Sequence, residues 1–508
     1  MDNKDAKLLL IGLDGAMPDL VKRFSQEKDL PYLHQLIQEG VFLEVLPSPP
    51  CDTPTNWVTI ATGAWTGTHG VTGFNIHLPG ESYEEGVSCA FDTKLCQAEF
   101  LWNVAEREGL TCLLYDYPPS RPPTIKNGIV LGGWFNPQRV GRGVGSFHSP
   151  GFIPTLPYPR SLLNRNFSDV LKTPIPLPKG TSESLEEILK KAQLECERFI
   201  NALGFLKKDR NWEVLFSQLH LLDYLTHEML NDIWEGHPDY TADKGERGWS
   251  TMKEAYSILD ETIGRVIEKF ASEETIICVI SDHGGVPSSR LVWPGAALQR
   301  AGLTKFIKND NNEYQIDVSQ SKAVFYFSPP EYIWVNLEGR DPTGIVKPGK
   351  EYEEIRTRII NALLDIRDPE NGKCPFSLVI RKEQADFIGQ WDKRCGDIVI
   401  FTEPEYTLVD FGMAERGVVN GVKELLEMGD LRIGGNTRQG SHHGHLPTHR
   451  ISPFSISGVA IIVGPNVRRG YSRQHPVQMV DIAPTLAHLL GWPKPAQAEG
   501  GILWDIFK

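Results

Sequence analysis

Four short, continuous apolar runs stand out along the chain, at residues 7–13, 214–219, 275–280 and 459–463. Runs of this length are typical of strands buried on both faces, as in a parallel sheet. Shorter or alternating apolar patterns predict further strands at residues 41–46 and 111–115.

Segments with helical spacing alternate with these runs and predict helices at residues 31–39, 57–62, 182–203, 249–270 and 480–490. Strands that alternate with helices indicate an α/β sandwich with a mostly parallel central sheet. In such a sheet ligands bind beyond the carboxyl ends of the strands, so polar residues at those ends are the candidates for function.

Two segments interrupt the alternation and are interpreted as insertions. Residues 118–180 are rich in Gly, Pro, Asn and Arg and are expected to form a loop-rich cap. Residues 286–439 carry more turns and mixed segments, and are expected to be a second insertion that governs substrate specificity. The catalytic core is then expected to comprise residues 1–117, 181–285 and 440–508.

Composition narrows the class of protein. The chain has 508 residues, 40% hydrophobic and 23% charged, which is ordinary for a globular protein. Its net charge of −13 argues against a nucleic-acid polymer as partner, since such a partner needs a basic face. No apolar run approaches the roughly 20 residues of a membrane span. The polar start and eight scattered cysteines favour a cytoplasmic protein without a membrane partner.

Carboxylates and imidazoles follow three of the apolar runs. Asp14 follows the first run, Asp223 and His227 follow the second, and Asp282 with His283 follow the third. Taken alone, Asp14 could belong to a common Asp-Gly turn, and Asp223 with His227 could be a hydrogen-bonded pair on a helix. Their shared position beyond strand ends is stronger evidence, because these side chains together bind divalent transition metals.

Two further segments offer candidate chemistry. Thr53 lies near the start of an expected helix, where backbone N–H groups favour a phosphate, although a helix N-cap is the simpler interpretation. A hydroxyl beside metal ions is a candidate nucleophile. Three histidines, His442, His443 and His445, lie in a late Gly-rich stretch, for which a solvated loop is the less favoured alternative.

The order of these motifs resembles the alkaline phosphatase superfamily. The matching stretches are residues 10–15, 53–63, 68–71, 222–227, 281–284, 440–442 and 463–465. The resemblance is closest to the type I phosphodiesterase/nucleotide pyrophosphatase branch and its phosphohydrolase/phosphomutase relatives. It implies a three-layer α/β sandwich that binds two divalent ions, usually zinc, with manganese as an alternative.

The resemblance also implies roles for individual residues. Asp223, His227 and a late histidine would hold one ion, and the other would be held by Asp14, Thr53, Asp282 and His283. The Gly-x-His register favours His442 as the late ligand, a His-Gly register would select His443, and His445 stays open. Asn56 matches an asparagine that holds a phosphoryl oxygen.

The implied activity is hydrolysis of a small phosphate ester, either a diester or a monoester, through a phosphothreonine at Thr53. Thr-Pro-Thr-Asn replaces the usual Thr-Phe-Pro-Asn, which argues against nucleotide-base recognition by an aromatic neighbour of Thr53. Cys51 does not begin a sulfatase motif. The alternatives are a phosphomutase, with Arg139, Arg142 and Arg160 as candidate cap residues, and a non-catalytic metal-binding protein. Oligomeric state is open.

Overall fold

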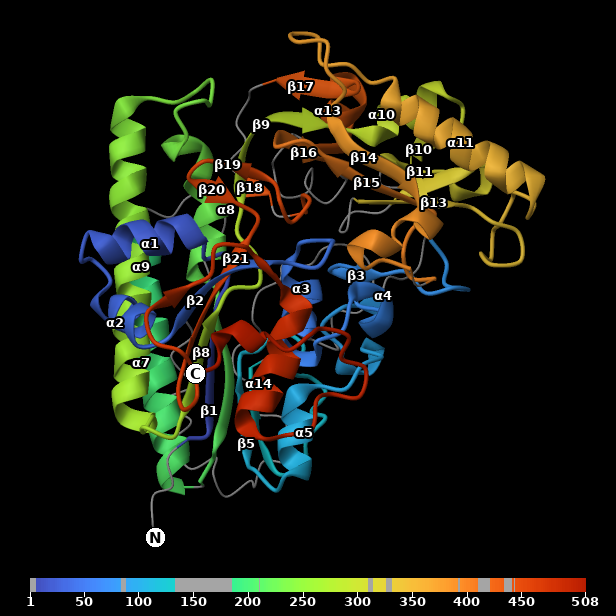
Figure 1. Cartoon of the computed structure of the whole chain (residues 1–508). Helices are drawn as coiled ribbons and strands as arrows, with labels where there is room; N and C mark the ends of the chain where they lie inside the picture. The colour runs from blue at the N-terminus through green and yellow to red at the C-terminus, as the bar shows by residue number, and fades with distance from the viewer. Residues whose placement is uncertain are drawn as a thin grey trace.

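A computed structural model describes residues 6–83, 88–132, 185–209, 211–308, 314–325, 331–391, 393–409, 421–433, 441–442 and 444–508. A nine-stranded sheet forms the centre of the molecule (Figure 1). Along the sheet the strands are β22 (Tyr471–Ser472), β2 (Val41–Leu46), β21 (Gly458–Val463), β8 (Ile276–Ile280), β1 (Leu8–Leu13), β7 (Val214–Leu219), β5 (Cys112–Tyr115) and β6 (Gly128–Leu131), and β23 (Val477–Gln478) also pairs with β2.

The centre of the sheet is parallel, as the apolar runs predict. β1 lies between β7 and β8, parallel to both, and β5 is parallel to β6 and β7. β21 runs antiparallel to its neighbours β8 and β2. The register aligns Leu13 of β1 with Leu219 of β7, and Gly12 with Ile280 of β8. The carboxyl ends of β1, β7 and β8 therefore meet at one edge.

Helices cover both faces of the sheet and make it the middle of three layers (Figure 1). Side chains alternate along β1, so that Leu9 and Ile11 face one core and Leu8 and Leu10 face the other. The first core is closed by α1 (Pro18–Gln26), α2 (Pro31–Glu39), α7 (Leu185–Asp209), α8 (Leu221–Ile233) and α9 (Ala242–Phe270). The second is closed by α3 (Thr53–Thr62), α5 (Leu101–Arg107) and α14 (Ile482–Leu490). The predicted α/β sandwich is confirmed.

The segment after β8 builds further sheets beside the core, in the yellow to orange part of Figure 1. One is antiparallel and consists of β12 (Ala323–Phe325), β13 (Tyr332–Val335), β15 (Ile398–Thr402) and β14 (Phe376–Arg381). The other consists of β16 (Glu405–Leu408), β9 (Val286–Val292) and β17 (Leu431–Ile433), with β18 (Ser441–His442) also paired to β9. This segment has its own apolar cluster, to which α10 (Pro294–Arg300) and α11 (Lys350–Leu364) contribute.

Short elements complete the described part of the chain. They are α4 (Thr66–His69), β3 (Asn75–Ile76), β4 (Ser88–Cys89), β10 (Phe306–Lys308), β11 (Tyr314–Ile316), α13 (Gly421–Met428), β19 (Arg450–Ile451) and β20 (Phe454–Ser455), with short 3-10 turns between some of them. No helix in the described ranges combines the length and the apolar character that crossing a membrane requires.

Three expected boundaries differ from the structure. β6 belongs to the central sheet, so the sheet extends into residues 118–180, which were expected to be a cap; residues 133–180 lie outside the described ranges. α9 begins at Ala242, seven residues before its apolar periodicity, because Thr241 caps a polar first turn through a hydrogen bond from the Lys244 amide. α3 begins at Thr53, because Asp52 caps it.

Candidate active site

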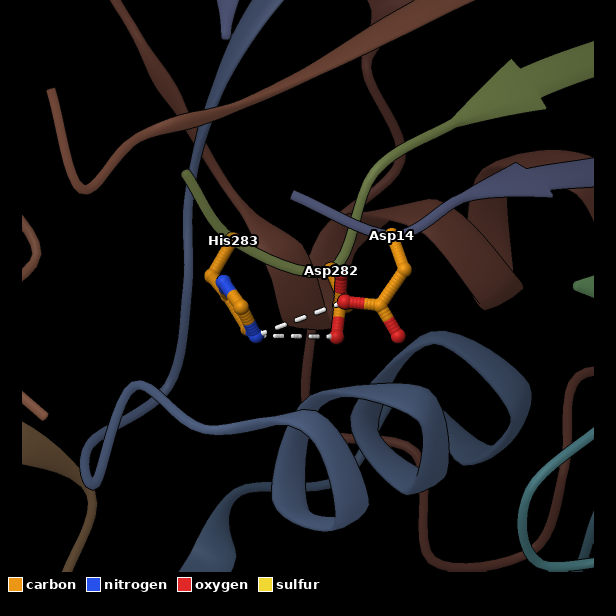
Figure 2. A group of neighbouring side chains, drawn as sticks. All are labelled: Asp14, Asp282 and His283. Atoms are coloured by element: carbon orange, nitrogen blue, oxygen red, sulfur yellow. Dashed lines mark ion pairs between the residues drawn. The ribbon is translucent and has the colours of Figure 1, made fainter. Parts of the chain in front are cut away.

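Two carboxylates and a histidine converge where β1 and β8 end (Figure 2). Asp14 follows β1, and Asp282 and His283 follow β8, with all three side chains fully buried. His283 Nε2 lies 3.3 Å from Asp282 Oδ2 and 3.7 Å from Asp14 Oδ1. Asp223 approaches from α8, directly beyond β7, because its backbone amide donates to the Asp14 carbonyl oxygen at 3.0 Å.

Asp14 is oriented by donors that all reach one of its two oxygens. Trp57 Nε1 donates to Oδ2 at 3.2 Å and Gln218 Nε2 donates to it at 2.5 Å, while His220 Nδ1 lies 3.1 Å away. Oδ1 is buried and accepts no hydrogen bond from the described residues. Buried carboxylate oxygens are normally satisfied, so the bare Oδ1 is a candidate metal ligand.

The tautomer of His283 follows from its neighbours. Its Nδ1 lies 2.8 Å from the Gly284 carbonyl oxygen, which can only accept, so Nδ1 carries the proton when the ring is neutral. Nε2 then keeps its lone pair and faces Asp14, Asp282 and the Thr53 hydroxyl, whose Oγ1 lies 3.2 Å away. An imidazole anchored through Nδ1–H, with Nε2 directed at carboxylate and hydroxyl oxygens, is the usual arrangement of a metal-binding histidine.

The electrostatics of the cluster call for a cation. Burial, followed by the charges of Asp14 and Asp223, raises the pKa of Asp282 well above its ordinary value. Burial also acts to raise the pKa of Asp14, but the charge and hydrogen bond of His220 outweigh it and lower the pKa. Buried carboxylates this close are costly unless a positive charge compensates them, and divalent ions are the usual solution.

The spacing between these side chains also fits bound ions. His227 Nε2 lies 3.5 Å from Asp223 Oδ1, similar to the 3.3 Å between His283 Nε2 and Asp282 Oδ2. Direct charged N–H···O bonds are shorter, about 2.7–2.9 Å. Two ligands each about 2.1 Å from one tetrahedral ion lie roughly 3.4 Å apart. The donor set and its spacing therefore fit divalent ions, and the i, i+4 pair lies on one face of α8 as expected.

Thr53 is fully buried and is the first residue of α3. Asp52, rather than Thr53, is the N-cap, and its side chain accepts the Thr55 amide at 3.2 Å. Its carbonyl oxygen accepts the Asn56 amide at 3.1 Å, and Pro54 has no N–H. In the described structure the N–H group of Thr53 is therefore the one amide of this first turn that makes no hydrogen bond, which makes it the available donor for an anion.

Asn56 hydrogen-bonds with backbone groups of nearby residues. Its Oδ1 accepts the Ser48 amide at 2.7 Å, and its Nδ2 donates to the carbonyl oxygens of Ser48 and Asp52, each at 3.0 Å. Both amide hydrogens are thereby used within the turn that leads into α3. In this conformation Asn56 fixes the turn that carries Thr53, and its role at a phosphoryl oxygen stays a prediction.

The late histidines are only partly described. The backbone of His442 pairs with Val286, close after His283, and β18 lies beside α8. This placement favours His442 as the late ligand, although its side chain is outside the described part of the structure, as is all of His443. His445 is buried with Nδ1 3.3 Å from Thr402 Oγ1, at the end of β15. Arg139, Arg142 and Arg160 lie outside the described residues.

His220 is part of the site although sequence reasoning assigned it no role. It lies directly after β7, with Nδ1 3.1 Å from Asp14 Oδ2 and Nε2 3.4 Å from Asp223 Oδ2. Burial lowers its pKa, but the charges of Asp14 and Asp223 outweigh this and raise the pKa to about 9. Knowing that β7 lies next to β1 would have identified His220, since His220 and Asp14 lie just beyond the ends of these adjacent strands.

Comparisons with known proteins identify the family through a family model and the fold through solved structures. A family model described as type I phosphodiesterase/nucleotide pyrophosphatase matches residues 8–418. The fold is similar to human ectonucleotide pyrophosphatase/phosphodiesterase 5, with a TM-score of 0.56 and 15% identity over 99% of this chain and 100% of that one. It is also similar to the alkaline phosphatase PafA, with a TM-score of 0.59 and 13% identity over 99% of both chains.

Phosphonoacetate hydrolase from Sinorhizobium meliloti 1021, in complex with phosphonoformate, is a third similar structure. Its TM-score is 0.55, with 13% identity over 96% of this chain and 95% of that one. Among curated proteins no match to the chain is found.

Proposed function

Because the chain belongs to the type I phosphodiesterase/nucleotide pyrophosphatase family of hydrolytic enzymes, within the alkaline phosphatase superfamily, we propose that it cleaves a small phosphate ester through a phosphothreonine at Thr53. One observation carries the proposal. The Thr53 hydroxyl lies 3.2 Å from His283 Nε2, inside the buried cluster of Asp14 and Asp282. The substrate is a phosphodiester or a phosphomonoester.

Two divalent ions are proposed to bind here, as in the superfamily, with zinc favoured by the nitrogen and oxygen ligands and manganese as the alternative. Asp14, Thr53, Asp282 and His283 would hold one ion. Asp223, His227 and a late histidine, His442 in preference to His443, would hold the other. When bound, the ions supply positive charge that lowers the pKa of a coordinated hydroxyl and offsets the charge on phosphoryl oxygens.

The chain itself orients the nucleophile and the substrate. The Thr53 hydroxyl lies at the positive end of α3, 3.2 Å from His283 Nε2, so that both groups could bind the same ion, and the N–H group of Thr53 is available to donate to a phosphoryl oxygen. In-line attack forms the Oγ1–P bond and breaks the bond between phosphorus and the leaving oxygen. Water then attacks the phosphothreonine, releases the phosphoryl group and restores the hydroxyl.

The relatives support a small phosphorylated substrate. Murine ectonucleotide pyrophosphatase/phosphodiesterase 5 has been crystallised as an inactive threonine-to-alanine variant in complex with AMP. The phosphonoacetate hydrolase holds phosphonoformate, which is also small and anionic. By analogy we propose that Thr53 is the corresponding nucleophile and that a small anionic phosphate compound occupies the site.

The test is hydrolysis of para-nitrophenyl phosphate and bis-para-nitrophenyl phosphate by zinc- or manganese-loaded protein. Thr53→Ala should lower turnover by at least about 10³-fold, since it removes the nucleophile. Thr357→Ala, on the exposed face of α11, is the matched control and should leave turnover unchanged. The preferred ester separates diesterase from monoesterase. Undiminished turnover by Thr53→Ala would refute the proposal, and an isomerised ester without free phosphate would indicate a mutase.

A further inference from the structure

His220 lies between two carboxylates that the proposed function assigns to different ions. Its Nδ1 lies 3.1 Å from Asp14 Oδ2, and its Nε2 lies 3.4 Å from Asp223 Oδ2. Ligand atoms of Asp14, His220 and Asp223 all lie within 4.8 Å of one another. Asp14 thus belongs to two groups that could hold a metal ion, one with His220 and Asp223 and one with Asp282 and His283.

The two contacts of His220 differ in kind. The 3.1 Å contact at Nδ1 is within the range of a hydrogen bond, so this nitrogen carries a proton and donates it to Asp14. The Gln218 amide nitrogen, 3.3 Å from the same Nδ1, cannot accept that proton and donates instead to Asp14 at 2.5 Å. A metal ion that displaces the second proton of the ring would then bind at Nε2, the nitrogen that faces Asp223.

The same arrangement occurs at His283. There Nδ1 is anchored 2.8 Å from the Gly284 carbonyl oxygen, and Nε2 faces Asp282 Oδ2 at 3.3 Å. At His220 the corresponding Nε2 to carboxylate distance is 3.4 Å. Both distances are close to the roughly 3.4 Å between two ligands of one tetrahedral zinc ion. A histidine that donates Nδ1–H to a carboxylate and binds metal through Nε2 is a recurrent metal-site arrangement.

We propose that His220 is a ligand of the second ion, through Nε2, beside Asp223 and His227. The inference rests on the proposed function for the presence of that ion, and adds a residue that the family motif does not supply. Its Nδ1–H group also connects this ion to Asp14, a ligand of the first ion. The second site then has at least two imidazole nitrogens, a donor set that favours zinc, cobalt or copper over magnesium and calcium.

The variants are chosen to separate metal ligation from positioning of Asp14. His220→Ala removes both nitrogens. His220→Asn places an amide N–H near the position of Nδ1, so it can still donate to Asp14, but it offers no imidazole lone pair to an ion. His34→Ala is the matched control, because His34 is an exposed histidine on α2. Circular dichroism and the unfolding midpoint of each variant check that the fold is kept.

The readouts are the number of ions bound per chain, after equilibrium dialysis against limiting zinc, and the visible absorption of the cobalt-substituted protein. We expect wild type and His34→Ala to hold two ions. His220→Ala and His220→Asn should both bind the second ion at least about tenfold more weakly and change the cobalt spectrum. Wild-type affinity and spectrum in His220→Asn would overturn ligation and leave only a positioning role.

The same measurements distinguish failure of the proposed function from failure of the inference about His220. If wild type binds two ions, loses one in both His220 variants, and yet cleaves neither nitrophenyl ester, the metal role of His220 stands and the phosphohydrolase assignment falls. If wild type cleaves the esters and both His220 variants bind two ions as wild type does, the phosphohydrolase assignment stands and the inference is overturned. Wild-type protein that binds fewer than two ions also overturns it.

Discussion

Replacing Gln218 with methionine should weaken metal binding although Gln218 is not expected to touch a metal ion. Its Nε2 donates to Asp14 Oδ2 at 2.5 Å, and both side chains are almost fully buried, with 2% and 0% exposure. Methionine is similar in length and apolar, so the change removes mainly this donor. A hydrogen bond to a buried charge contributes about 1.5–3 kcal/mol. Trp57 and His220 remain as donors, so we expect the lower end, about 1.5 kcal/mol of unfolding free energy.

The effect on metal affinity should be about tenfold, since residues that orient a metal ligand typically contribute 10- to 100-fold. Unfolding by urea in the presence of a chelator measures the change in unfolding free energy, and competition with a zinc indicator measures the change in metal affinity. Gln35→Met is the matched control, because Gln35 makes the same kind of bond to Glu39, at 2.9 Å, on an exposed helix face. Zinc affinity of Gln218→Met within twofold of wild type would refute the orienting role, whatever its stability.

Further predictions concern the loop after β8, the antiparallel sheet that contains β15, and the proposed metal ions. In Gly284→Ala the added Cβ would lie 2.1 Å from the Ser455 carbonyl oxygen, so the backbone must shift, and elemental analysis should show less bound metal than in wild type. Asp397→Asn removes buried contacts to Arg340, at 2.8 Å, and Lys382, at 3.1 Å, and should cost about 3 kcal/mol in urea unfolding at neutral pH. Burial acts to raise the pKa of Asp397, but Arg340 outweighs burial and lowers the pKa. The ionised carboxylate therefore stabilises the folded chain above the unfolded-state pKa of about 3.9, and this stabilisation is lost as pH falls through the lower folded-state pKa. An acid titration of stability should therefore be shallower in the variant, and an identical acid profile would contradict this. Removing metal with a chelator should lower the unfolding free energy by about 2.7 kcal/mol for each bound ion, at ion concentrations 100 times the dissociation constant. An unchanged melting temperature would argue against bound ions.

The central sheet could be predicted because its strands are continuous apolar runs. β1, β7 and β8 were each identified from the sequence, and the polar residues just beyond them form the site. β6 was missed because four residues in a Gly- and Pro-rich stretch carry too little periodicity. Its place at the sheet edge depends on pairing with β5, which the local sequence does not encode.

The positions of individual site residues depended on long-range order. His220 contacts Asp14 across 206 residues of sequence, and only the adjacency of β7 and β1 brings the two together. The contacts of Asn56 with its own turn depend on the path of residues 48–52, which the spacing of the motif does not determine. Conversely, the i, i+4 spacing of Asp223 and His227 was enough to predict that the two side chains lie close together, because helix geometry alone places them on one face.

The most direct test of the central claim is to look for a phosphoryl group on Thr53 during turnover. Metal-loaded protein is mixed with para-nitrophenyl phosphate or the diester, quenched in acid within milliseconds to seconds, digested and analysed by peptide mass spectrometry. We expect a phosphorylated peptide whose modified residue is Thr53, absent from Thr53→Ala and from metal-free protein. Turnover of the ester with no phosphothreonine at any quench time, or with the phosphoryl group on another residue, would contradict the account.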